Sequence, residues 1–548
     1  MNIHLLSKLL NNCNFDINSL KEKNNPGMLT NDLKNNNKIY IGEDIGPLDD
    51  LNDIPSPYLT GLLDPFFEGF YVPIIETNRS CPYRCTFCAW GIGTQKLLRF
   101  DEERVKEEIK YIASRTKHTG SLYIADANFS ILERDVNFAR EIYKQHAEVG
   151  YPNFVIVQWN KTRPDRVARV AKEFKHITQV GASMQSFDED VLKAIKRKNL
   201  SIDQINGLLS DLKQFSSQEN TFSELIIGLP RETKKSHLEA NRKLINMGFE
   251  INNYNLHLLP GTEMSGEESR KEYFKKTGWR LYDNGYGIYN NKLIVEGEEV
   301  VTETTTLSVD DFKYFRFFHF LQQMMWGKKW YYEYLIFLKN HNIHPVDVIN
   351  EIIIRCKEDK KNQMHNVFSA FIWDYTEAES FSTFEELKNF WSKPKNLERL
   401  ESGEYGKLNS LYTFEVVLKN RDSFRNLLLD IKDKFINNYK IEDKDNFKMA
   451  YDEVVIFQES LHVKIDNELN VEEKFSKKFK YDFINWKNKN YPKLEKVQNN
   501  KEVNFYISKD QKKFLQQQFN QYRSKNISAT LRMMSVDSDP WQFIYNIK

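Results

Sequence analysis

The chain has 548 residues, of which 40% are hydrophobic and 28% are charged, and its formal net charge is +1. This balance is typical of a folded globular protein. It argues against a nucleic-acid or membrane binder, because those proteins need strongly basic surfaces or long apolar runs. The length predicts roughly two to four domains. The opening Met1 to Leu10 has too short an apolar stretch for a signal peptide, so we expect a cytoplasmic protein whose partners include neither membranes nor nucleic acids.

Residues 1–69 are expected to form an N-terminal extension and linker. The last part of this segment, Leu48 to Asp64, reads L-D-D-L-N-D-I-P-S-P-Y-L-T-G-L-L-D. Proline disfavours the helical conformation of the residue before it, and acidic residues suit a solvated connector. We therefore expect an extended linker ahead of a folded core.

From residue 70 to residue 264, short apolar runs alternate with amphipathic segments, which predicts a parallel sheet covered by helices. The expected strands are Phe70–Glu76, Ser121–Ala125, Phe154–Gln158, Thr178–Met184, Phe222–Ile227 and Asn253–Leu259. The expected helices are Glu102–Ser114, Arg134–Val149, Pro164–Phe174, Glu189–Lys196, Asp203–Lys213 and Thr233–Met247. A closed eight-unit barrel usually needs about 250 residues. This block is shorter, so we predict an α/β fold with a partial, TIM-like (β/α)6 barrel. A doubly wound sheet is the alternative, but no G-x-G-x-x-G follows a strand.

Three cysteines, Cys81, Cys85 and Cys88, lie in the loop after the first expected strand, in the run C-P-Y-R-C-T-F-C. Three thiolates this close suit a cubane iron–sulfur cluster, which ordinarily takes four cysteines, so one iron would remain open for chemistry. A structural zinc site needs a fourth ligand, and residues 81–100 contain no further Cys and no His. Five cysteines in the whole chain are too few, and odd in number, for a disulfide framework. Reduced thiols that bind a cluster fit best.

The motif resembles the signature of the radical S-adenosylmethionine (radical SAM) superfamily, C-x3-C-x-aromatic-C, with Phe87 in the aromatic position. The resemblance implies a 4Fe-4S cluster held by Cys81, Cys85 and Cys88, with SAM bound to the fourth iron. It also implies that an electron, from a donor such as flavodoxin or ferredoxin, cleaves SAM into methionine and a 5'-deoxyadenosyl radical. In such an enzyme the cofactors carry the chemistry, while the protein positions them and excludes water.

Three further phrases resemble blocks of the same superfamily. They are M-Q-S-F-D-E-D-V-L-K-A-I-K-R at the fourth strand, I-I-G-L-P-R-E-T at the fifth and H-L-L-P-G-T-E-M at the sixth. Arg231 stands where many relatives carry glycine. The resemblance covers Phe70 to Met264, about a third of the chain.

Polar residues at the strand ends are the candidates for SAM contacts. Asp126 and Asn128 follow the second strand, where an acidic group would accept a hydrogen bond from the SAM ammonium. Arg163 follows the third strand and would meet the SAM carboxylate with its two-pronged guanidinium. Each residue also has a structural interpretation, as a partner of loop amides.

The fourth and fifth strands add further candidates. Ser183 and Gln185 offer hydroxyl and amide groups that suit ribose oxygens. Glu224 and Gly228 lie on and just after the fifth strand, where a glycine permits the backbone to approach a flat adenine. The alternative is that Gly228 is needed only for the backbone conformation of its turn.

The linker looks like the one that joins a cobalamin-binding domain to the radical core in the B12-dependent branch of the superfamily. About sixty residues precede the core, which we expect to be too few for such a domain, and no D-x-H-x2-G motif is present. Two alternatives remain: a cobalamin-free epimerisation, rearrangement or dehydrogenation, which we favour, and a methylation whose cobalamin is supplied by a separate protein. Methylthiolation is disfavoured, because only Cys13 and Cys356 remain for a second cluster.

The sequence changes in character beyond Met264. Residues 265–309 are expected to form an irregular, partly extended connector, residues 310–440 a helical domain, and residues 441–548 a further α or α+β unit. Aromatic residues recur at helical spacing in Asp310 to Leu338, a pattern more typical of core than of a cofactor site. Cys356 lies on an expected apolar helix, where a thiol is usually packed core, although it would also suit a hydrogen-atom donor.

Two classes of function remain in view. The leading hypothesis is an enzyme that abstracts hydrogen from a carbon of a small molecule, sugar, lipid or peptide. The alternative is a non-catalytic iron–sulfur or zinc module. A module that only binds a metal would not need polar residues at the ends of its strands, so these residues favour the enzyme.

Overall fold

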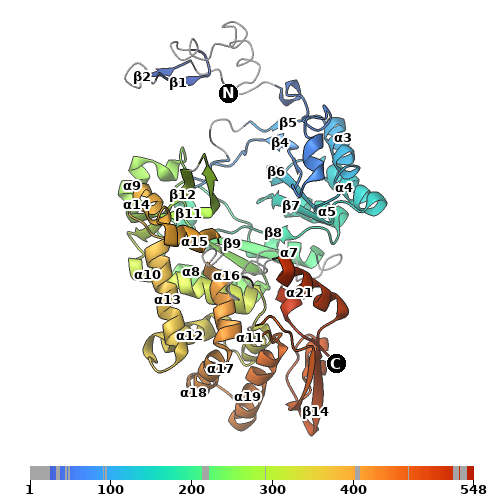
Figure 1. Ribbon diagram of the computed structural model, residues 1–548, viewed down its shortest axis with the longest axis vertical. Coiled ribbons are helices and arrows are strands. Elements are labelled where there is room, and N and C mark those ends of the chain that lie inside the picture. The colour runs from blue at the N-terminus through green and yellow to red at the C-terminus, as the bar shows by residue number, and fades with distance from the viewer. Residues whose placement is uncertain are drawn as a thin grey trace. The chain divides into compact units, whose positions relative to one another are not determined.

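The computed structural model divides into two compact units (Figure 1). Unit 1 comprises Met1–Tyr83 and Trp90–Thr178, and unit 2 comprises Arg84–Ala89 and Gln179–Lys548. The structure describes residues 25–32, 38–43, 46, 50–90, 92, 96–212, 221–290, 292–401, 408–466, 468–521, 530 and 540–548. Cys13 lies outside these described residues.

Unit 1 is built on a parallel sheet with the strand order β3-β6-β7. Its strands are β3 (Ile74–Ile75), β6 (Ser121–Phe129) and β7 (Phe154–Trp159), and its helices are α3 (Glu102–Ala113), α4 (Asp135–Val149) and α5 (Pro164–Phe174). Most of β6 alternates buried with partly buried side chains, because successive residues of a strand face opposite sides of the sheet. Helix α5 begins at proline, whose missing N–H is not needed at the first helical position.

The strands and helices predicted in unit 1 are confirmed, except that β3 is much shorter than the predicted Phe70–Glu76. Phe70 and Tyr71 are exposed, and Pro73 has no N–H to extend the ladder. The smaller elements of this unit are β1 (Leu29–Asp32), β2 (Lys38–Ile41), the 3-10 turns Leu51–Asp53 and Asp64–Glu68, β4 (Asn78–Arg79) and β5 (Leu98–Arg99).

Unit 2 carries a second parallel sheet, with the order β10-β9-β8. Its strands are β8 (Val180–Gly181), β9 (Thr221–Ile227) and β10 (Glu250–Asn255), and the helices between and after them are α6 (Glu189–Ala194), α7 (Ile202–Leu212) and α8 (Lys234–Met247). Thr233 and Ser236 form a reciprocal cap at the start of α8, and Gly248 ends that helix in the left-handed conformation. The six predicted βα units are therefore present in chain order.

Two strand boundaries in unit 2 differ from the prediction. The sixth strand was predicted at Asn253–Leu259, which is wrong by several residues, because β10 begins at Glu250 and is mostly polar, so a hydrophobicity pattern does not reveal it. The fourth strand is only Val180–Gly181, since Gln185 turns the chain with a φ of 65°.

The predicted irregular connector 265–309 is more regular than expected. It contains α9 (Glu267–Tyr273) after the 3-10 turn Glu263–Ser265, and then a long antiparallel hairpin of β11 (Phe274–Tyr289) and β12 (Lys292–Thr304). Register shifts interrupt the hairpin, and glycines within it weaken the alternating pattern that marks a strand.

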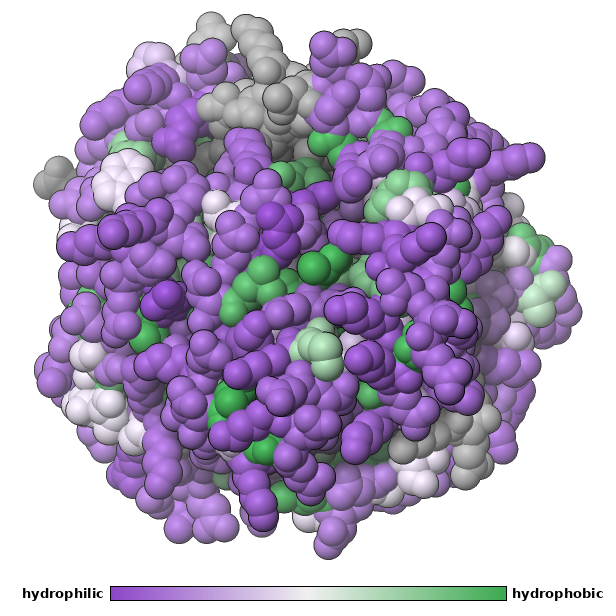
Figure 2. Space-filling view, turned by 90° about the horizontal axis from the view of Figure 1, so that it is seen from below, coloured by the Kyte–Doolittle hydropathy of each residue, from purple (hydrophilic) through white to green (hydrophobic). Residues whose placement is uncertain are grey.

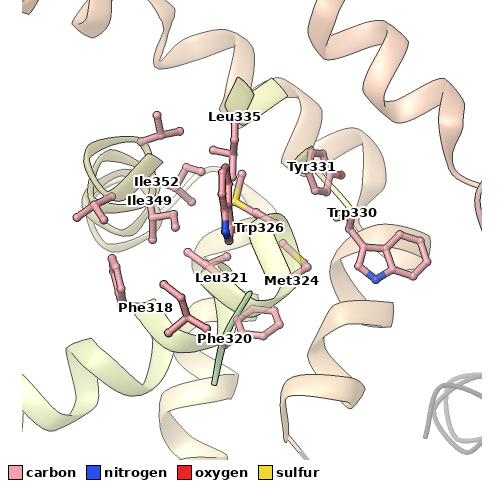
Figure 3. Close-up of a cluster of buried hydrophobic side chains, with 14 of the residues drawn as sticks. Phe318, Phe320, Leu321, Met324, Trp326, Trp330, Tyr331, Leu335, Ile349 and Ile352 are labelled. Atoms are coloured by element: carbon pink, nitrogen blue, oxygen red, sulfur yellow. The ribbon is translucent and has the colours of Figure 1, made fainter. Parts of the chain in front are cut away.

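The helical region has a core rich in aromatic side chains, part of which Figure 3 shows. Its helices are α10 (Val309–Gln322), α11 (Tyr332–Lys339), α12 (Pro345–Glu358), α13 (Gln363–Ala378), α14 (Phe384–Trp391), α15 (Pro394–Glu401), α16 (Leu408–Phe414), α17 (Arg421–Asp430), α18 (Lys432–Asn438) and α19 (Lys444–Leu461). The predicted aromatic helix is interrupted by a π-helical turn, Gln323–Gly327; a second π turn, Glu415–Lys419, follows α16. The aromatic stripe is core, as predicted.

The last part of unit 2 mixes strands and helices. It contains β13 (Lys474–Tyr481), α20 (Phe483–Asn488), β14 (Lys496–Tyr506), α21 (Lys509–Gln521), the 3-10 turn Pro540–Phe543 and β15 (Asn546–Ile547). The face in Figure 2 is mostly hydrophilic, with apolar residues in small separate spots. None of the described helices has the length and apolar character needed to cross a bilayer.

Candidate active site

The first cysteine of the motif is held in unit 1 by the end of strand β6. Cys81 is buried, and Asn128 Nδ2 donates a hydrogen bond to Cys81 Sγ at 3.0 Å. Asn128 is itself buried, and its Oδ1 has no hydrogen-bond partner among the described residues. Amide donors to sulfur stabilise a thiolate and tune the potential of a cluster that it binds. Asn128 was predicted as a SAM contact, and the structure places it beside a sulfur.

Asp126, two residues earlier on β6, is fully buried and receives hydrogen bonds from the chain just before the cysteines. The amide of Thr77 donates to Oδ1 at 2.7 Å, while Thr77 Oγ1 and Asn78 Nδ2 donate to Oδ2 at 2.5 and 2.6 Å. Burial raises the pKa of Asp126 to about 6, and these donors oppose the shift. Its contacts are those of a loop anchor, so the proposed contact with the SAM ammonium stays a prediction.

The third strand end presents Asn160 and Arg163. Asn160 Oδ1 accepts from the amides of Thr162 and Arg163, whereas its buried Nδ2 has no partner among the described residues. The Arg163 guanidinium is exposed and pairs with Asp165 through Nε and Nη2, each at 3.2 Å. Arg163 would have to leave this pair to bind the SAM carboxylate.

The other two cysteines lie in a short loop that belongs to unit 2. The amide of Thr86 donates to the carbonyl of Ile195 at 3.2 Å, and the amide of Met264 donates to the carbonyl of Thr86 at 2.9 Å. Phe87 packs against the hydrophobic core of this unit. The aromatic position of the motif thus anchors the loop between Cys85 and Cys88.

Arg197 is a buried cation beside these two cysteines that the sequence analysis did not single out. Burial lowers its pKa, and the neighbouring Cys85, Glu224 and Cys88 oppose that shift. Nη2 donates to the carbonyl of Ser183 and Nε donates to Asn199 Oδ1, while buried Nη1 has no partner among the described residues. The only sequence signal was its place at the end of the block M-Q-S-F-D-E-D-V-L-K-A-I-K-R.

Three predicted residues of unit 2 do come together. Ser183 Oγ donates to Glu224 Oε2 at 2.5 Å, and Gln185 Nε2 approaches the same oxygen at 3.5 Å. Gln185 Oε1 is buried without a partner among the described residues. The carboxylate, hydroxyl and amide form a cluster of the kind that binds vicinal hydroxyls.

Gly228 has a φ of 91°, and a Cβ there would lie 2.9 Å from Phe312 Cζ of α10. Packing against α10 is thus sufficient reason for this glycine, and its predicted approach to adenine stays a prediction. Arg231, where relatives carry glycine, has a φ of 66°, in the left-handed region that glycine favours.

The donor set fits an iron–sulfur cluster by its chemistry: three thiols, an amide donor to one of them and a cation beside the other two. Among the described residues, no group of three or more His, Cys, Asp or Glu side chains is arranged to hold a metal ion. Joint ligation by Cys81, Cys85 and Cys88 therefore stays a prediction.

A family comparison decides the identity of the core. Residues 75–269 match the model of the radical SAM superfamily. The chain thus contains a radical SAM domain in this segment. The predicted fold class, an α/β partial barrel followed by a mostly helical region, is confirmed by this match and by the order of the observed elements. The predicted cofactors, a 4Fe-4S cluster and SAM, are those of the radical SAM superfamily.

Two curated relatives match about half of the chain. TokK of Streptomyces tokunonensis, a cobalamin-dependent radical SAM methyltransferase, is 34% identical over 294 residues, which are 51% of this chain and 42% of TokK. A 2-(S-pantetheinyl)-carbapenam-3-carboxylate methyltransferase of Streptantibioticus cattleyicolor is 35% identical over 275 residues, which are 47% of this chain and 39% of the relative. The matched region thus spans less than half the length of these curated relatives.

Solved structures of radical SAM proteins align less well. OxsB, a cobalamin-dependent S-adenosylmethionine radical enzyme, aligns over 83% of this chain and 66% of its own, with 13% identity and a TM-score of 0.39. TsrM from Kitasatospora setae aligns over 51% of this chain and 55% of its own, with 15% identity and a TM-score of 0.38. These TM-scores are too low to support a residue-by-residue comparison.

Proposed function

We propose that this protein is a radical SAM enzyme that reductively cleaves SAM and uses the resulting 5'-deoxyadenosyl radical to abstract hydrogen from a substrate carbon. The observation that carries the proposal is the C-x3-C-x2-C run inside the segment that matches the superfamily. The cluster, when bound, would supply the electron that breaks the sulfonium bond. The electron would come from a donor such as flavodoxin or ferredoxin, in the cytoplasm.

The residues divide the work as follows in this proposal. Cys81, Cys85 and Cys88 hold the cluster, with Asn128 donating to the first sulfur. Arg197, with Nη1 unpaired and Glu224 nearby, is a cation placed to meet the carboxylate of bound SAM.

The polar cluster at the β8 and β9 ends is the proposed ribose site. Glu224 would accept from the two ribose hydroxyls, and Ser183 and Gln185 hold that carboxylate in place. A partly buried, already hydrogen-bonded carboxylate needs little reordering when a ligand arrives, which favours binding.

Anaerobic reconstitution with iron and sulfide, followed by dithionite and SAM, tests the proposal. The expected result is 5'-deoxyadenosine, detected by liquid chromatography, in amounts that depend on both dithionite and the cluster. An intact cluster that yields no 5'-deoxyadenosine would instead favour the non-catalytic iron–sulfur module. Tetrahedral zinc in place of iron would favour the zinc module.

A second candidate function is methylation with cobalamin as methyl carrier. It is favoured by the names of the relatives, two of which are methyltransferases that are 34% and 35% identical to this chain. The similarity to these methyltransferases counts against the cobalamin-free reaction that we favoured from the sequence. In such a reaction cobalamin, when bound, would carry the methyl group that SAM gives up, and SAM would leave as S-adenosylhomocysteine.

The two candidates are separated by adding hydroxocobalamin to the reduced, reconstituted protein. S-adenosylhomocysteine formed only when cobalamin, or a separate cobalamin-binding protein, is present supports methylation. Formation of 5'-deoxyadenosine without S-adenosylhomocysteine supports the cobalamin-free reaction.

A further inference from the structure

Three buried ionisable side chains contact one another in a row within unit 2; we call this chain of side chains the buried relay. Glu232 lies in the loop after β9, His237 on α8 and His319 on α10. His237 Nδ1 lies 3.3 Å from Glu232 Oε1, and His237 Nε2 lies 2.9 Å from His319 Nε2. Glu232 and His237 are 0% exposed, and His319 is 5% exposed. Charged or ionisable groups are rarely buried like this without a role or a partner.

The buried relay is linked to the proposed ribose site through Ser186. Ser186 Oγ donates to Glu232 Oε1 at 3.4 Å and accepts from the amide of Asp188 at 3.3 Å. The preceding residue, Gln185, has a φ of 65°, a conformation that side-chain-bearing residues hold only when their surroundings enforce it. Asn199 Nδ2 donates to the carbonyls of Met184 and Ser186 at 2.8 and 2.7 Å. Glu232 therefore holds the strained turn through the side chain of Ser186, and Asn199 holds it through backbone carbonyls.

Only one hydrogen atom fits between the two imidazole Nε2 atoms, which fixes how protons are arranged along the buried relay. With Glu232 ionised, the Nδ1 proton of His237 faces the carboxylate across the 3.3 Å contact, which lacks hydrogen-bond geometry, and His237 Nε2 accepts from His319. Uptake of one proton by Glu232 reverses both polarities: the carboxyl proton then faces His237 Nδ1, and His237 Nε2 donates to His319. Both arrangements keep the hydrogen bond between the two imidazoles, but only the first gives Ser186 a negatively charged acceptor.

We infer that Glu232, His237 and His319 are positioning residues that hold the Gln185–Ser186 turn in its SAM-binding conformation through a shared proton. This inference rests on the proposed function for its link to SAM. Burial raises the pKa of Glu232, which His237 opposes, and burial lowers the pKa of His319 well below its usual range. The other charged groups that face the buried relay are Asp188 near Glu232 and Arg316 near His319. The ionised arrangement is lost as pH falls through the raised pKa of Glu232, so SAM affinity should fall with it.

The test compares three variants of the reconstituted protein: Glu232→Gln, His319→Asn and His462→Asn. His462 is the matched control, because it is also fully buried in unit 2 but bonds the carbonyl of Trp330. We expect the dissociation constant for SAM to rise about five- to tenfold in E232Q and H319N and to be unchanged in H462N. We also expect E232Q to lose the decrease in affinity that the wild type shows on acidification.

Hydrogen exchange without SAM provides the independent readout. Amides of residues 185–188 should exchange faster in E232Q and H319N than in the wild type, and at the wild-type rate in H462N. Unchanged exchange there, or equal effects of all three variants on SAM affinity, would overturn the positioning role. A wild type that binds no SAM would refute the proposed function instead, while the exchange rates would still decide whether the buried relay holds the turn.

Discussion

Cys85 is the residue whose loss should have the clearest consequence. In Cys85→Ala two thiols of the motif remain, and two thiolate ligands hold a cubane cluster poorly. We expect iron to fall from about four atoms per chain to under one. SAM cleavage should be abolished, as measured by iron assay and 5'-deoxyadenosine yield. Cys356→Ala is the matched control, because Cys356 is buried in α12 and burial raises its pKa to about 12. Retention of the cluster in C85A, or its loss in C356A, would contradict the assigned ligands.

Asp126 gives a prediction about pH. Its pKa is raised from 3.8 to about 6, so the native carboxyl binds a proton more tightly than the unfolded one does. Between about pH 4 and 6 the native state thus holds more protons, and this residue's contribution to the free energy of unfolding decreases as pH rises. In Asp126→Asn that dependence disappears.

Asp126→Asn should also be less stable at pH 8, by about 1–3 kcal/mol, since an amide NH2 would face the donors of Thr77 and Asn78. Thermal unfolding at pH 5 and pH 8 measures both effects. Asp165→Asn, which removes an exposed partner of Arg163, is the control and should change little. Equal losses in the two variants would count against the anchoring role.

Sequence reasoning found the residue types of the site better than their partners. Spacing alone nominated the cysteines, and strand-end logic nominated Ser183, Gln185 and Glu224, which do meet. It did not foresee that Asp126 and Gly228 are engaged by their own fold, or that Arg197 lies beside two cysteines. Those facts depend on contacts between residues dozens of positions apart, which no local pattern encodes.

At the scale of elements, the turn after β9 offers a direct test of packing. Gly228→Ala would combine a left-handed φ of 91° with a Cβ only 2.9 Å from Phe312. We expect a loss of roughly 2–4 kcal/mol of stability, from backbone strain and a steric clash together. Gly150→Ala is the control: its φ is 79°, but nothing lies within 4 Å of the added Cβ, so only the strain of about 1 kcal/mol applies. Denaturant midpoints would compare them, and equal losses would show that Phe312 moves aside.

The elements that the sequence predicted best are those with strong local signals. Helix α5 was predicted to the residue, because proline marks its start. Strand β10 was misplaced because its polar residues hide it, and the β11–β12 hairpin was taken for an irregular connector because glycines and bulges break its alternation. Tertiary pairing, not propensity, fixes both.

At the scale of the whole molecule, charge balance governs behaviour in solution. The sequence pI is about 7.6, so the protein carries almost no net charge in common neutral buffers. Self-association should therefore be greatest near that pH and should weaken about one unit above or below it. Light scattering at low salt measures this, and a solubility minimum far from pH 7.6 would point to attraction between apolar surfaces instead.

The π-helical turn Gln323–Gly327 has a consequence for how this lineage can change in length. The amide of Lys328 donates to the carbonyl of Gln323, one residue farther back than in an α-helix. Trp326, labelled in Figure 3, donates from Nε1 to the carbonyl of Phe249. Deleting one residue there would restore α-helical spacing and rotate everything beyond it by about 100° about the axis. Tyr331 and Leu335, both buried, would then leave their places in the core. We therefore expect related proteins to differ in the residue types of this turn but to keep its length.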